Sequence, residues 1–174
     1  MSLISAIIPP DPYSEEDWAS EGNDRLVKQL SNVSQFLRGI KVQMRFGKLT
    51  RAPLRLIRFQ IIDIHVECDW LARSLDPWDA YVPQDIRQRH ASLQALRDAI
   101  DVRFLLFSLM PQVESAHFRT YRDTHHGTRE LIISGCMQRN DHSARKVHSL
   151  VMRSKVLGFR FEMEDDRLLE ISQG

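Results

Sequence analysis

Polar residues alternate with apolar ones in the segment Asp63-Ile-His65-Val-Glu67-Cys-Asp69. On a β-strand, side chains two residues apart share a face, so this pattern predicts one polar face along the segment. Carboxylates next to an imidazole could support general acid–base catalysis. The same residue types could also ligate a divalent metal. An enzyme centred on Asp63, His65 and Glu67 is one hypothesis. The alternative is the solvent-exposed side of a half-buried strand.

His125 and His126 precede Gly127 in a predicted hairpin turn. Together with His65 and Glu67 they are the metal-ligand candidates of this sequence. The indication is weak, because adjacent side chains point to opposite sides of a strand. Exposed turn histidines are the simpler interpretation. No Ser-His-Asp or Cys-His catalytic set can be traced, and no cofactor is identified.

Acidic residues are absent between positions 25 and 62. This stretch carries nine basic residues, namely Arg25, Lys28, Arg38, Lys41, Arg45, Lys48, Arg51, Arg55 and Arg58. A second acid-free stretch, 142–161, carries Arg145, Lys146, Arg153, Lys155 and Arg160. Such stretches could neutralise phosphates, so binding of nucleic acid is a second hypothesis. The alternative is pairing with the acids that gather in the first 23 residues, in 63–85 and in 162–166.

The segment 69–79 combines two tryptophans, three aspartates and one arginine. Loops with large aromatic side chains often bind a partner, although this one could equally cover the sheet. Taken with the basic stretch, the segment gives a set of residues predicted to contact a partner. They are Arg45, Lys48, Arg51, Arg55, Arg58, Trp70, Arg73 and Trp78.

The spacing of apolar residues predicts the elements that position these groups. Helices are expected from Asp24 to Gly39, from about Gln84 to Met110, and from Asp141 or Ser143 to Gly158. Strands are expected at 40–46, 56–68, 116–122 and 129–138, with a closing hairpin at 159–171. The alternation in 56–68 slips near Leu56 and again near Ile61, which indicates a bulge or bend.

The order of these elements is helix, strand, strand, three times over. It predicts an α+β fold with an antiparallel or mixed sheet and helices packed on one face. We expect a single domain over 24–174, preceded over 1–23 by an acidic arm that contains Pro9, Pro10 and Pro12.

The composition limits the classes of protein to which this chain could belong. With 174 residues, 43% hydrophobic and 27% charged, the chain can fold without disulfide or metal. Cys68 and Cys136 lie in apolar runs and are expected to be buried and reduced. No apolar stretch is long enough for a bilayer, and Met1 to Pro10 lacks the basic start of a signal peptide. We therefore expect a soluble, cytoplasmic protein without membrane contact.

Three functions remain open from the sequence. The leading hypothesis is a non-catalytic binding domain that meets an acidic or mixed-charge protein partner, or its own copy as a homodimer. The alternatives are the enzyme with a bound metal or phosphorylated substrate, and nucleic-acid binding.

Overall fold

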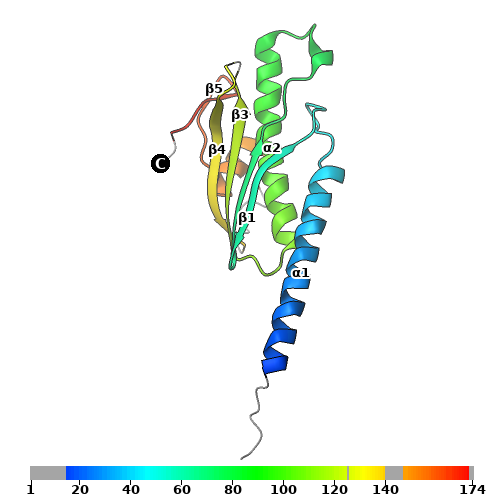
Figure 1. Ribbon diagram of the computed structural model, residues 1–174. Helices are drawn as coiled ribbons and strands as arrows, with labels where there is room; N and C mark the ends of the chain where they lie inside the picture. The colour runs from blue at the N-terminus through cyan, green and yellow to red at the C-terminus, as the bar shows by residue number, and fades with distance from the viewer. Residues whose placement is uncertain (1–14, 125, 140–146, 173–174) are drawn as a thin grey trace, which may run out of the picture.

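The computed structural model describes residues 15–124, 126–139 and 147–172 (Figure 1). Its longer elements are α1 (Glu15–Val42), β1 (Arg55–Ile62), β2 (His65–Leu71), α2 (Gln84–Leu109), β3 (Ser115–Asp123) and β4 (Arg129–Gln138). Its shorter elements are the 3-10 helix η1 (Pro77–Asp79), α3 (Leu150–Val156), β5 (Met163–Glu164) and β6 (Arg167–Leu168). The helix-strand-strand order is as predicted.

One mixed sheet, in the order β1-β2-β3-β4, forms the frame of the fold. β1 and β2 are antiparallel, as are β3 and β4, whereas β2 and β3 run parallel. A parallel pair needs a crossover connection, and α2 supplies it between β2 and β3. The α+β class with a mixed sheet is therefore confirmed. No helix of the described residues is long and apolar enough to cross a membrane.

The core lies between the sheet and the helices, which pack on one face as expected (Figure 1). Alternate residues of β2 point into it, and Val66, Cys68 and Trp70 have no exposed surface. Trp70 meets Phe118 of β3 edge to face, with ring centroids 6.0 Å apart. Trp70 was predicted to contact a partner, but in this structure it is a core residue.

The first helix differs most from its predicted form. α1 begins at Glu15, so residues 15–23 are helical, and it continues through Gly39 to Val42. The strand predicted at 40–46 is therefore wrong. Phe36, Ile40 and Met44 follow one another at intervals of four residues, and all three are buried. Gly39 is a packing position, because a Cβ there would lie 3.0 Å from Cδ2 of Leu105.

The single long strand predicted at 56–68 is a hairpin. The first slip in its alternation is a β-bulge between Leu56 and Arg58, which confirms that prediction. The second slip is a chain reversal at residues 63 and 64. Asp63 lies in this turn with φ 55°, a left-handed backbone conformation that Asp tolerates better than most residues.

The C-terminal segment covers the free edge of β4. Ser134 and Arg160 exchange backbone hydrogen bonds, and Ile171 N donates to Leu131 O. α3 is capped by Ser149. The caps predicted at Asp141 or Ser143 lie outside the described residues. Cys136 of β4 is exposed, which corrects the prediction of two buried thiols.

Candidate functional site

A buried ion pair organises one end of the molecule. Arg73 follows β2, and its Nε and Nη2 donate to the two carboxylate oxygens of Asp98 on α2, at 2.8 and 3.1 Å. The same guanidinium donates to the carbonyls of Met44 at 2.6 Å and Ala52 at 2.7 Å. Burial raises the pKa of Asp98, while the hydrogen bonds from Arg73 and Gln94 oppose that shift. Arg73 therefore ties the chain after α1 to α2.

The segment 43–54 between α1 and β1 is held at two further points. Leu49 N donates to Oε1 of Gln94 at 2.8 Å, and Arg51 N donates to Oδ2 of Asp76 at 3.3 Å. Gly47 is required by a close approach, since a Cβ there would lie 2.3 Å from the carbonyl of Thr50. A segment without regular structure is thereby fixed against α2 and the loop before η1.

Two adjoining hollows flank this segment. The basic hollow has a volume of about 320 Å³ and is lined by Lys48, Arg73, Arg97, Asp98, Asp101 and Arg153, among others. The tryptophan hollow has a volume of about 300 Å³ and is lined by Lys48, Arg51, Asp76, Trp78 and Asp79, among others. Lys48 lines both, so the two hollows form one continuous surface.

The basic hollow has a surplus of positive charge. Four cationic side chains line it against two carboxylates, and one of these carboxylates is already paired with Arg73. Within the described part of the chain, Lys48, Arg97 and Arg153 make no ion pair. The other carboxylate is that of Asp101; burial raises its pKa, and the charges of Lys48, Arg153 and Arg97 oppose that shift. The lining of the hollow therefore holds more positive than negative charge.

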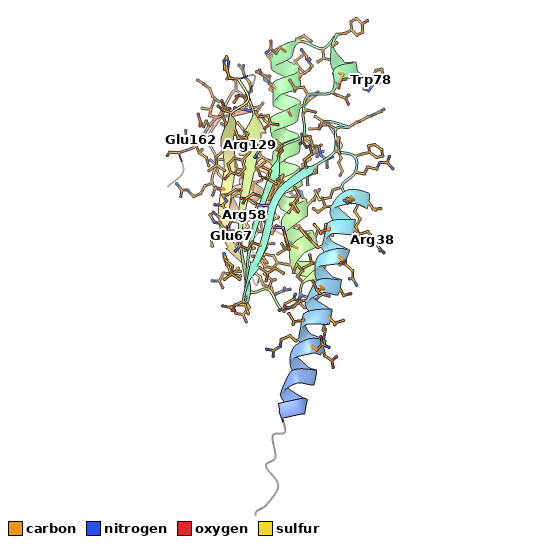
Figure 2. All side chains as sticks on the ribbon, in the orientation of Figure 1. Arg38, Arg58, Glu67, Trp78, Arg129 and Glu162 are labelled. Atoms are coloured by element: carbon orange, nitrogen blue, oxygen red, sulfur yellow. The ribbon has the colours of Figure 1, made fainter. Side chains whose placement is uncertain are left out.

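The helix-free face of the sheet carries a second polar cluster. Arg119 of β3 donates to Oδ1 of Asp69 at 2.7 Å and to Oε2 of Glu67 at 3.0 Å. Glu67 also pairs with Arg58 of β1 at 2.9 Å, and Figure 2 shows this pair well away from Trp78. Burial, followed by the charge of Arg119, lowers the pKa of His117 on the same face. Both carboxylates are thus neutralised by arginines.

Of the three residues of the enzyme hypothesis, His65 and Glu67 share the polar face of β2, and Asp63 does not lie on this strand. β2 begins at His65, so Asp63 lies in the preceding turn and does not join the polar face of the strand. Nδ1 of His65 and Oγ of Ser115 are hydrogen-bonded at 2.8 Å, while Glu67 is held by two arginines. Among the described residues, no three His, Cys, Asp or Glu side chains could hold a metal.

The remaining metal candidates give no site either. His126 is exposed in the turn before β4. His125 lies outside the described residues.

The predicted partner-contacting residues divide into three groups. Lys48, Arg51 and Trp78 meet at the two hollows. Arg73 is buried, and its guanidinium forms an ion pair with Asp98. The others lie elsewhere: Arg45 stacks on Phe46 at 5.1 Å, Arg58 pairs with Glu67, Arg55 starts β1, and Trp70 is in the core.

Two of the four cationic residues that line the basic hollow, Arg97 and Arg153, were not among the predicted partner contacts. Arg153 belongs to the second acid-free stretch, which was a signal for it. Arg97 lies in the middle of α2 among mixed charges, and nothing local distinguishes it from the other arginines of that helix.

The chain matches no family model, no curated protein and no solved structure.

Proposed function

We propose that this protein is a non-catalytic binding module whose two hollows hold an acidic segment of a protein partner. The surplus of positive charge in the basic hollow carries this proposal: Lys48, Arg97 and Arg153 line it, and Asp101 is the one carboxylate among its described lining residues that Arg73 does not pair. Carboxylates of a bound segment would pair with Lys48, Arg97 and Arg153.

Exposed aromatic side chains beside the hollows support a protein ligand. Trp78 lines the tryptophan hollow with 84% of its surface exposed, and Tyr81 is 99% exposed three residues later. Trp, Tyr and Arg are the residue types that most often dominate the energy of protein interfaces. The position of Trp78 at the end of the molecule is visible in Figure 2.

Carboxylates within the same surface favour a polypeptide over nucleic acid. Asp76, Asp79 and Asp101 line the hollows and would repel a continuous phosphate backbone. A polypeptide with mixed charges can match both signs. The setting we propose is cytoplasmic, where the two free thiols would remain reduced.

The test uses fluorescence anisotropy with a labelled peptide rich in Asp and Glu that contains one aromatic residue. The double substitution Lys48→Glu with Arg153→Glu is expected to weaken binding by at least about tenfold, because two attractive contacts become repulsive. Lys28→Glu is the matched control, since Lys28 is exposed on α1 and does not line either hollow. Trp78 emission should shift on binding.

A single-stranded RNA of the same length distinguishes the competing hypothesis. RNA that binds more tightly than the peptide, with an affinity falling steeply as salt rises, would replace the proposal by nucleic-acid binding. Peptide binding that is absent, or that Lys28→Glu weakens as much as the double substitution, would also overturn it.

A further inference from the structure

The basic hollow takes its cations from three distant segments of the chain. Lys48 comes from segment 43–54, Arg97 from the middle of α2 and Arg153 from α3. None of the three forms an ion pair with a residue that the structure describes. Arg97 and Arg153 are half-buried, so solvent screens their charges less than it screens fully exposed ones.

The same three cations converge on one point, the carboxylate of Asp101. Burial raises the pKa of this carboxyl, and the charges of Lys48, Arg153 and Arg97 all act in the opposite direction. Charges that shift a pKa in this way lie mostly within about 4–6 Å of the group. The three cationic groups are therefore close enough together to contact a single small anion.

Charge balance indicates which kind of anion the basic hollow would take. Among its described lining residues, four cations exceed two carboxylates by two positive charges. A phosphate monoester carries a charge of about −1.5 to −2 at pH 7 and has three strong acceptor oxygens. A carboxylate carries one charge on two oxygens. One phosphate monoester therefore matches both the surplus charge and the number of unpaired cations, whereas one carboxylate matches neither.

The size of the basic hollow also suits a single group. Its volume of about 320 Å³ lies at the lower end of the range that ligand sites usually span, roughly 300–1,000 Å³. Two carboxylate side chains could supply the same charge only by crowding together there, and like charges oppose that. Gln43 and His148 complete the lining with side chains that can donate hydrogen bonds.

We propose that the acidic segment bound by this protein is phosphorylated, and that its phosphate monoester lies in the basic hollow between Lys48, Arg97 and Arg153. This inference rests on the binding function proposed above and names the group that the hollow recognises. Arg97 and Arg153 suit the role, because a guanidinium can donate two parallel hydrogen bonds to phosphate oxygens. Lys48 also lines the tryptophan hollow, so residues next to the phosphorylated one would contact Trp78.

The carboxylates of the tryptophan hollow favour an isolated phosphate over those of a nucleic acid. Each phosphodiester of a nucleic acid carries only one negative charge. Its neighbours along the backbone would also meet Asp76 and Asp79. A single phosphate on a peptide brings two charges to the basic hollow and none to the carboxylates beside it.

Three forms of the labelled acidic peptide test this inference. They are identical except for serine, glutamate or phosphoserine at the position beside the aromatic residue. Fluorescence anisotropy is expected to give a Kd for the phosphoserine form at least about tenfold below that for the glutamate form, because phosphate adds charge and an acceptor oxygen.

Substitutions on α2 locate the phosphate. Arg97→Gln is expected to reduce the preference for phosphoserine to about threefold or less, since it removes one of the three cations. Arg89→Gln is the matched control, because Arg89 is also half-buried on α2 but does not line either hollow. Asp101→Asn should tighten binding of the phosphoserine form roughly threefold, a gain that loss of folding could not produce.

The possible outcomes separate this inference from the binding function. Equal affinities for the phosphoserine and glutamate forms would overturn the inference and leave the binding function standing. Failure of all three forms to bind would overturn both. A preference for phosphoserine that Arg89→Gln reduces as much as Arg97→Gln would mean that the phosphate binds outside the basic hollow, which contradicts this inference alone.

Free phosphoserine distinguishes a peptide from a small phosphate ester as the source of the group. It is expected to displace the phosphoserine peptide only at concentrations at least about tenfold above the Kd of that peptide, because it cannot reach the tryptophan hollow. Free phosphoserine that binds as tightly as the peptide would show a site for small phosphate esters and would overturn the proposed peptide ligand.

Discussion

Arg73 connects three parts of the chain through one guanidinium group. Its counter-ion is Asp98 of α2, and it donates to the backbone carbonyls of Met44 and Ala52, near the two ends of segment 43–54. Its fork geometry allows this, because five N–H donors diverge in one plane. A buried ion pair adds little net stability compared with apolar side chains of similar volume in the same place. Removing one of the two partners, however, leaves the other as an uncompensated buried charge.

Asp98→Ala is expected to lower the free energy of unfolding by about 3–5 kcal/mol, because Arg73 would remain buried without its counter-ion. Glu114→Ala, an exposed carboxylate between α2 and β3, is expected to change it by less than about 0.5 kcal/mol. Urea titration followed by circular dichroism measures both. Equal effects for the two substitutions would contradict the structural role given to the Arg73–Asp98 pair.

At the scale of elements, the binding surface depends on segment 43–54 keeping one conformation. This segment has no regular secondary structure, so its shape comes from contacts with its neighbours: Leu49 with Gln94, Arg51 with Asp76, and Gly47 against the carbonyl of Thr50. Lys48 lines both hollows only while these contacts hold.

Gly47→Ala is expected to destabilise the protein by about 1–3 kcal/mol, because the added methyl would overlap the Thr50 carbonyl and the side chain of Gln94. It should also weaken binding of the acidic peptide, since Lys48 follows directly in the chain. Thermal unfolding and the anisotropy titration give the two readouts. A Gly47→Ala protein with unchanged stability would show that the close approach is not needed.

Sequence periodicity predicted most elements and failed where two periods fit the same residues. The boundaries of α2, β3 and β4 follow directly from their patterns. Between Ile40 and Phe46, apolar residues recur every two positions, but Ile40 and Met44 also match a helical period. In the structure the helix continues through Val42, and irregular turns follow it, because Phe36, Ile40 and Met44 pack into the core. No local sequence pattern contains that information.

The candidate site was predictable only in part, for a related reason. Lys48 and Arg51 stood out because their stretch lacks acids, and Trp78 because its loop is rich in aromatic and acidic residues. The basic hollow, however, gathers Lys48, Arg97 and Arg153 from three distant segments. Only the packing of α2 and α3 beside segment 43–54 brings them together.

At the scale of the whole molecule, the two hollows lie at the end where segment 43–54 meets the loop of η1, and the N-terminal half of α1 projects at the opposite end (Figure 1).

The parallel pairing of β2 with β3 imposes an order of events during synthesis. His65 and its strand partner Ser115 are 50 residues apart, and the whole of α2 lies between them. At ribosomal rates, β3 is completed roughly 3–10 s after β2. Throughout that interval the edge of β2 lacks its partner strand, and Trp70 lacks its contact with Phe118 of β3. We therefore expect the newly made chain to be prone to aggregation while α2 is being translated.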